Sequence, residues 1–115
     1  MIGQPRQVAC RIPSLKKLKH DIAVERIIAE VAKVANVEPD NLQDRRTRFK
    51  DLRRMAMELS YRYSNYKQKE IGAIFGVDYS TVSQNRVRLK NKLKSNRKLK
   101  KQFDQFLKHI DNMSN

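Results

Sequence analysis

The stretch "IGAIFGVDYSTV", residues 71–82, restricts the folds open to this chain more than any other. Two helical patterns meet there, with only Gly76, Val77 and Asp78 between them. Glycine can take the positive φ that ends a helix, and aspartate is a favoured N-cap of the next one. Two helices joined by so short a turn are expected to cross at a steep angle.

The residues around this turn have the spacing that such a crossing needs. This spacing is typical of a helix-turn-helix, whose second helix lies in the major groove of DNA. The alternative is an ordinary helical hairpin in a bundle. The matching positions are Ile71 and Phe75 on the core face, Gly72 where the second helix crosses, Gly76 in the turn, Val77 as an apolar plug and Val82 facing inward.

Asn85 departs from this spacing, because an apolar residue usually stands three positions after Val82. Two explanations are open. Either the second helix is rotated so that Arg86 and Leu89 share its inner edge, or Asn85 forms hydrogen bonds within the core.

Helical periodicity extends over most of residues 21–111, and no strand period is present. We therefore predict an all-α fold, a compact domain of about five helices that contains the helix-turn-helix. The predicted boundaries are residues 1–20 for a basic arm or linker, 21–95 for the DNA-binding domain and 96–115 for a C-terminal amphipathic helix. The predicted helices are 22–35 with Asp21 as N-cap and Asn36 at its end, 47–63, 66–75 with an Asn65–Gln68 capping box, 78–93 and 97–111, with a single turn possible at Pro39.

Two apolar stripes define the predicted packing. The helix over 47–63 turns Phe49, Leu52, Met55, Ala56, Leu59 and Tyr63 to one face. The last helix turns Leu99, Phe103, Phe106, Leu107 and Ile110 to one face. This second stripe either packs on the chain's own core or serves as a docking face, through which residues 99–110 would allow self-association.

The charge of the chain indicates a polyanionic partner. Lys and Arg number 26 against 12 Asp and Glu, a formal net charge of +14. Such a balance attracts DNA, RNA or acidic lipid without distinguishing them. Residues 86–101 alone hold nine Lys or Arg, and no Asp or Glu stands between Tyr79 and Gln102. This run is either a series of phosphate contacts or a solvated cationic surface.

The helix-turn-helix spacing assigns roles to two groups of side chains. Short or planar hydrogen-bonding groups at the start of the second helix can read base edges. The predicted base-reading residues are Asp78, Tyr79, Ser80, Thr81, Ser83 and Gln84. The predicted phosphate or minor-groove contacts are Arg45, Arg46, Arg48, Lys67, Lys69, Arg86, Arg88, Lys90 and Lys92.

Two of these assignments keep a second reading. Asp78 is an N-cap, an acceptor from cytosine N4, or both. Thr81 contacts either a base or a phosphate. The cluster Arg45, Arg46 and Arg48 stands just before a helix, where an arginine can enter a minor groove.

The sequence lacks the motifs expected of an enzyme, a metal-binding protein or a membrane protein. His20 and His109 are far apart, and no His-x-His, His-Glu-x-x-His or Cys-x-x-Cys spacing occurs. We therefore expect no enzyme activity, no cofactor, no metal and no small-molecule substrate. No apolar run of membrane-spanning length is present, and the single Cys10 fits a reducing compartment. The expected location is the cytoplasm, in association with the nucleoid.

The segment "VAKVANVEPDNLQDRRTRFKDLRRMAMELSYRY…QKEIGAIFGVDYSTV" resembles the C-terminal DNA-binding domain of the bacterial replication initiator DnaA, over about residues 22–93. The resemblance implies that Asp78, Tyr79, Ser80 and Thr81 read bases in the major groove, and that Arg45, Arg46 or Arg48 reaches the minor groove. The family usually has "GGRDHSTV" where this chain has "GVDYSTV". The turn here is shorter, lacks the family's arginine and has Tyr79 in place of a histidine, so the specificity for the family's usual site does not carry over.

The segment "YSTVSQNRVRLKNKLKSNRKLKKQF" is similar to the tail of REP-associated transposases, which carry a DnaA-like domain. No nucleotide-binding G-x-x-x-x-G-K-[ST] motif is present. Double-stranded DNA is therefore the expected partner, for a DnaA-like domain of a replication-initiator-related or transposase-related protein. RNA binding and a protein-interaction module are the alternatives.

Overall fold

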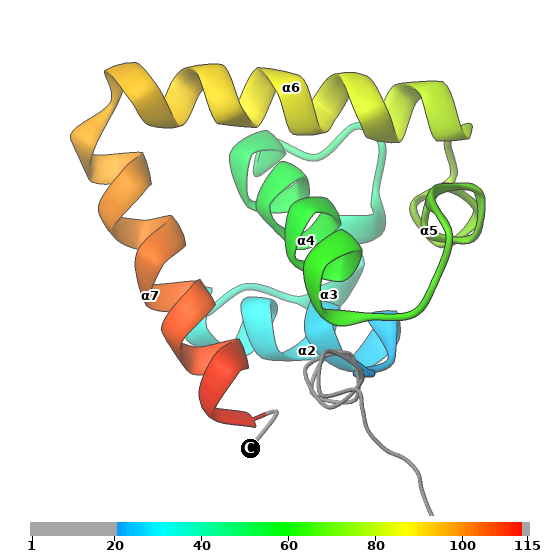
Figure 1. Ribbon diagram of the computed structural model, residues 1–115, viewed down its shortest axis with the longest axis horizontal. Helices are drawn as coiled ribbons and strands as arrows, with labels where there is room; N and C mark the ends of the chain where they lie inside the picture. The colour runs from blue at the N-terminus through cyan, green and yellow to red at the C-terminus, as the bar shows by residue number, and fades with distance from the viewer. Residues whose placement is uncertain (1–20, 114–115) are drawn as a thin grey trace, which may run out of the picture.

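The computed structural model describes residues 21–113, which form an all-α fold (Figure 1). The predicted fold class is confirmed. Within these residues no strand is present, and no helix is both long and apolar enough to cross a membrane. The predicted arm over residues 1–20 lies outside the described residues. The helices are α2 (Val24–Ala35), α3 (Pro39–Gln43), α4 (Lys50–Tyr63), α5 (Gln68–Phe75), α6 (Tyr79–Ser95) and α7 (Arg97–Met113).

Helix α4 is the centre of the core, and the other helices surround it (Figure 1). Its predicted apolar face is buried, with Met55, Ala56 and Leu59 fully covered. Met57, outside that face, is covered as well. A helix that is buried on more than one side needs neighbours all round it. The positions of α5 and α6 are therefore set largely by the side chains of α4 against which they pack.

The first helix begins later than predicted. Ala23, with extended backbone, is the N-cap of α2, so the prediction of Asp21 as N-cap is wrong. The physical reason is a long-range hydrogen bond, in which the Ile22 N–H donates to the Tyr63 carbonyl at 2.8 Å and holds the chain extended. The end of the helix is as predicted, because Asn36 takes the left-handed conformation at φ 60°.

Side-chain hydrogen bonds delay the start of α4. The helix begins at Lys50, not at residue 47. Asp44 Oδ1 accepts the Arg46 N–H at 2.9 Å, and Thr47 Oγ1 accepts the Phe49 N–H at 3.1 Å. Such bonds compete with helix formation and favour turns. They give a fixed shape to the loop over 44–49, which carries the predicted minor-groove arginines.

The start of α5 is also displaced. Ser64 Oγ accepts the Tyr66 N–H at 3.2 Å, and the helix begins at Gln68 with Lys67 as N-cap. The predicted Asn65–Gln68 capping box is therefore wrong. Glu70 supplies one half of a capping box instead, since its carboxylate accepts the Lys67 N–H at 2.7 Å. A lysine side chain has no acceptor to supply the other half.

Helix α7 folds back onto the rest of the domain and contacts α2, α4 and α6 (Figure 1). Phe103, Phe106 and Ile110 are buried. His109 Nε2 lies 2.8 Å from Glu30 Oε1 on α2, and this hydrogen bond lowers the pKa of the Glu30 carboxyl. Of the two readings of the 99–110 stripe, packing on the chain's own core is the one that the structure confirms.

Candidate nucleic-acid interface

Helices α5 and α6 are joined by a tight turn whose geometry depends on two glycines. Gly76 ends α5 in the left-handed conformation at φ 73°, as predicted. A Cβ on Gly72 would lie 2.5 Å from the Val77 carbonyl oxygen. The small residue is needed there because the turn backbone, rather than α6 itself, passes over Gly72. Figure 1 shows α5 end-on and α6 side-on, so the two helices cross steeply.

Asp78 begins α6 as its N-cap. Its Oδ1 accepts the Thr81 N–H at 2.8 Å, and this bond lowers the pKa of the Asp78 carboxyl below its ordinary value. A carboxylate at this place also stabilises the positive end of the helix dipole. The structural reading of Asp78 is confirmed, and contact with cytosine remains a prediction.

The inward face of α6 is narrow, which leaves much of its circumference open. Val82 and Leu89 are fully buried, and Leu93 is half-buried. Within the first two turns, Tyr79 is 61% exposed. Among the other predicted base-reading residues, Ser80 and Gln84 are exposed, and Thr81 and Ser83 are half-buried. The start of the helix therefore presents hydrogen-bonding groups to solvent.

Asn85 links α6 to α4. Its Oδ1 accepts from Arg54 Nε at 3.0 Å, and its Nδ2 donates to the Thr81 carbonyl at 2.8 Å. This is the second explanation of its departure from the usual spacing. Arg86 is half-buried next to it and also faces α4, so elements of both explanations are present.

The loop over 44–49 brings one arginine to the start of α6. The Arg45 stem packs beside Gly76, with its Cδ 3.6 Å from where a Cβ on that glycine would lie. Arg45, Val77, Asp78 and Thr81 line the same shallow hollow. Arg46 is exposed further along the loop, and the Arg48 guanidinium lies over the Phe49 ring, 5.1 Å from its centroid. Of the three predicted arginines, Arg45 is the one next to the base-reading residues.

A second hollow, which we call the basic hollow, continues from the first between α4 and α6. Its volume is about 240 Å³. The charged side chains that line it are Arg45, Lys50, Arg53, Arg54 and Arg88. Lys50 and Arg54 were not predicted as site residues, because only the packing of α4 against α6 brings them there. Thr81 borders both hollows.

Arg53 anchors the end of α5, just before the turn, to the core. It is 7% exposed, and its guanidinium donates to the Leu42 carbonyl at 3.0 Å and to the Phe75 carbonyl at 2.6 Å. Both carbonyls lie at the C-terminal ends of helices, where intrahelical partners are missing. Burial, followed by the charge of Arg45, lowers the pKa of Arg53, but an arginine side chain stays protonated in proteins.

Two predicted phosphate contacts are bound to carboxylates. Arg86 Nε lies 2.7 Å from Glu58 Oε1, and its guanidinium lies over the Tyr61 ring, 3.4 Å from the centroid. Lys92 Nζ lies 2.9 Å from Asp51 Oδ1. Arg88 and Lys90 are exposed, and no carboxylate within residues 21–113 pairs with either. The basic run is therefore not uniform.

Lys67 and Lys69 are exposed at the N-terminal end of α5, whereas the turn follows its C-terminal end. Further exposed cations continue along the second half of α6 and the start of α7. They are Lys94, Arg97, Lys98, Lys100 and Lys101.

The short turn, the capped second helix and the basic loop beside it define a helix-turn-helix domain. The chain belongs to the family described as the bacterial DnaA protein helix-turn-helix, whose sequence model matches residues 24–88, more than half of the chain. No curated protein and no solved structure gives a significant match. The family match ends within α6, so it gives no support to the transposase resemblance of the tail.

Proposed function

We propose that this domain binds double-stranded DNA sequence-specifically, with the first turns of α6 in the major groove. Tyr79, Ser80 and Gln84 supply exposed groups suited to base edges: Gln pairs with adenine, Ser with either partner, and the Tyr ring contacts a thymine methyl. Asp78 caps the first turn and accepts from cytosine N4, and Thr81 touches either a base or the adjacent phosphate.

The observation that carries this proposal is the juxtaposition of Arg45 with the start of α6. An arginine on a loop beside a recognition helix can enter the minor groove next to the major groove that the helix occupies. The basic hollow, with Lys50 and Arg88, then lies where a phosphate between the two grooves would be expected. Arg54 beside them is paired with Asp51 at 3.3 Å. A helical hairpin without a DNA role has no need of this convergence of cations.

The family membership supports a role in a replication-initiator-related protein. A transposase-related protein is the second candidate, and it rests only on the tail sequence. Both roles place the domain on chromosomal DNA, that is, in the cytoplasm at the nucleoid.

Selection of bound sites from a random duplex pool tests the proposal directly. We expect enrichment of one short site. Competition between the selected duplex and an RNA duplex of equal length is the control. Equal affinity for both over several salt concentrations would contradict DNA recognition and favour the RNA alternative.

The affinity for the selected duplex should depend steeply on salt. Neutralising about six phosphates gives a slope of about −5 for log affinity against log salt concentration. Fluorescence anisotropy titrations from low to moderate salt measure it. A slope close to zero would rule out binding dominated by phosphate contacts.

Two variants on α6 should separate base reading from phosphate contact. Gln84→Ala is expected to change the preferred site while leaving the salt slope unaltered. Arg88→Ala is expected to weaken all duplexes similarly and to reduce the magnitude of the slope by about 1. Arg88 suits this test better than Lys92, whose ammonium is already paired with Asp51. If both variants alter preference and slope alike, the division of α6 into these two roles is wrong.

A further inference from the structure

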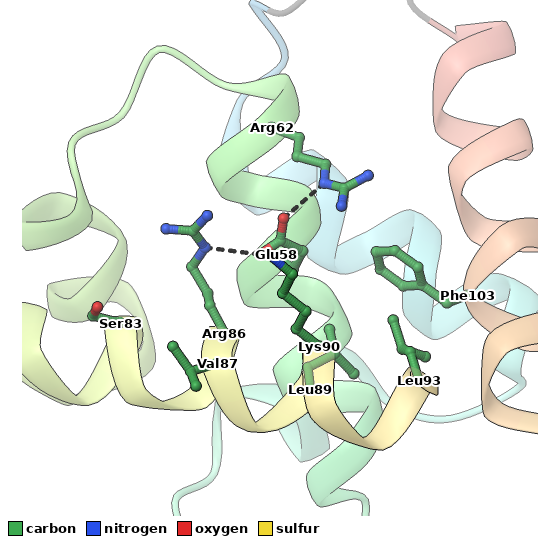
Figure 2. A pocket seen from close by; sticks show the side chains of 9 residues that line it. All are labelled: Glu58, Arg62, Ser83, Arg86, Val87, Leu89, Lys90, Leu93 and Phe103. Carbon is green, nitrogen blue, oxygen red and sulfur yellow. Dashed lines mark hydrogen bonds and ion pairs between the residues drawn. The ribbon is translucent and has the colours of Figure 1, made fainter. Parts of the chain in front are cut away.

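A groove lies between α4, α6 and α7, separate from the basic hollow (Figure 2). Its main part has a volume of about 340 Å³. Figure 2 shows Leu89, Leu93 and Phe103 at its floor, with Val87 at one side and Lys90 toward the viewer. An adjoining hollow, which shares Leu93 and Phe103, extends the groove toward Leu107 on α7.

The groove uses a different stripe of α6 from the residues that line the basic hollow, although three predicted DNA contacts, Ser83, Arg86 and Lys90, also line the groove. Residues 83, 87, 90 and 94 border the groove, whereas residues 81, 85 and 88 border the basic hollow. Steps of three and four residues keep each set on one side of a helix. Ser83, a predicted base-reading residue, therefore lies at the end of the groove and not beside Thr81.

Exposed apolar surface marks the groove. Val87 is 57% exposed and Tyr61, whose ring stacks on the groove-lining Arg86, is 46% exposed. Only two other large apolar side chains within residues 21–113 are comparably exposed, Tyr79 and Val34. The groove thus combines an apolar floor of Leu89, Leu93 and Phe103 with an exposed valine at its edge and a charged rim.

The charges at the groove are positive. Its one carboxylate, Glu58, is bound on both sides, to Arg62 Nε and Arg86 Nε at 2.7 Å each (Figure 2). Arg62 also lies over the Phe103 ring at 5.4 Å. Lys90 and Lys94 are exposed on the α6 side. A ligand with carboxylates around an apolar side chain would pair its carboxylates with the cationic rim and place its apolar side chain on the floor.

We propose that this groove binds an acidic segment of a partner protein that inserts at least one bulky apolar side chain between α6 and α7. DNA is a poorer match, since phosphates gain nothing from an apolar floor. A second copy of this chain is also a poorer match, because each copy carries a net charge of +14. The proposal does not depend on the DNA-binding function.

A designed peptide provides the test. A fluorescein-labelled helical peptide of glutamate and leucine, with all leucines on one face, is titrated with the full chain. A scrambled peptide of the same composition is the control for simple charge attraction. We expect the amphipathic peptide to bind about tenfold more tightly, the effect of burying one or two aliphatic side chains. Equal binding of the two peptides, or no binding of either, would overturn the proposal.

A matched pair of variants locates the binding. Val87→Lys removes apolar contact at the groove but adds a positive charge, and Val34→Lys makes the same change on α2, where Val34 is 43% exposed. Charge attraction alone predicts tighter peptide binding for both. Docking in the groove predicts weaker binding, by about tenfold, for Val87→Lys only.

DNA binding by the same variants distinguishes the groove from the DNA interface. Duplex affinity is expected to stay the same or rise slightly for both, because each adds a cation. Loss of duplex affinity in Val87→Lys alone would assign the groove to DNA and overturn the proposal. The affinity of the unmodified chain for the DNA duplex is measured separately, and it tests the proposed function and not the groove.

Discussion

A chain in which Arg53 is replaced by methionine is expected to lose about 3 kcal/mol of unfolding free energy. The methionine keeps much of the apolar bulk, so the loss comes from the charge and its hydrogen bonds. Without the guanidinium, the Leu42 and Phe75 carbonyls are buried with no donor in its place. Each unsatisfied buried group costs about 1–3 kcal/mol.

The geometry explains why lysine should not rescue this variant. The planar guanidinium reaches the ends of α3 and α5 at once and also lies over the Phe75 ring, 5.3 Å from its centroid. A single ammonium cannot reproduce this fork. Urea denaturation of Arg53→Met and Arg53→Lys measures the effect, with Arg46→Met as the exposed control. A loss at Arg53 no larger than that at Arg46 would contradict the role given to this side chain.

Replacing Gly72 with alanine should destabilise the domain by about 2 kcal/mol and also weaken DNA binding by about tenfold. The added Cβ would meet the Val77 carbonyl oxygen at 2.5 Å and the Asp78 backbone at 3.2 Å. These are backbone atoms, so the turn itself must move. Displacement of Asp78 shifts the first turn of α6 relative to Arg45. The base-reading residues and the minor-groove arginine can then no longer contact the same DNA site together.

Gly76→Ala is the matched comparison for this prediction. A Cβ there would lie at an ordinary 3.6 Å from the Arg45 stem, so only the left-handed backbone at φ 73° opposes it. That strain costs about 1–2 kcal/mol. Denaturation and anisotropy titrations of both variants decide the matter. If Gly72→Ala is as stable and binds DNA as well as the unmodified chain, the close approach at Gly72 does not set the turn.

Local patterns in the sequence were enough to predict the five longer helices and the turn, whereas α3 was expected only as a possible single turn at Pro39. The apolar face of α4, the left-handed Asn36 and Gly76, and the Asp78 cap all follow from spacing and residue type. The errors at helix starts have a common cause. Asp21 and Asn65 are good N-caps by residue type, but other hydrogen bonds, one of them long-range, already fix the chain there.

The interface was predictable only in part, because a count of charges along the sequence does not reveal which cations pair with carboxylates on another helix. Arg86 and Lys92 looked like members of one basic run, yet they pair with Glu58 and Asp51, which lie 28 and 41 positions away on α4. Burial of Arg53 likewise depends on carbonyls contributed by α3 and α5. Such pairings depend on the tertiary structure, so a local sequence pattern does not predict them.

The run of cations along α6 and α7 has a consequence for the free protein as well. Arg86 and Lys92 are paired with carboxylates of α4, but Arg88, Lys90 and Lys94 have no carboxylate partner within residues 21–113 to relieve their mutual repulsion. Dissolved ions screen that repulsion, and a bound polyanion neutralises it. Added salt therefore acts in opposite directions on two equilibria: it favours the folded state of the free domain and disfavours its complex with DNA. Thermodynamic linkage then makes the bound duplex a stabiliser of these two helices, most effective where ionic strength is lowest.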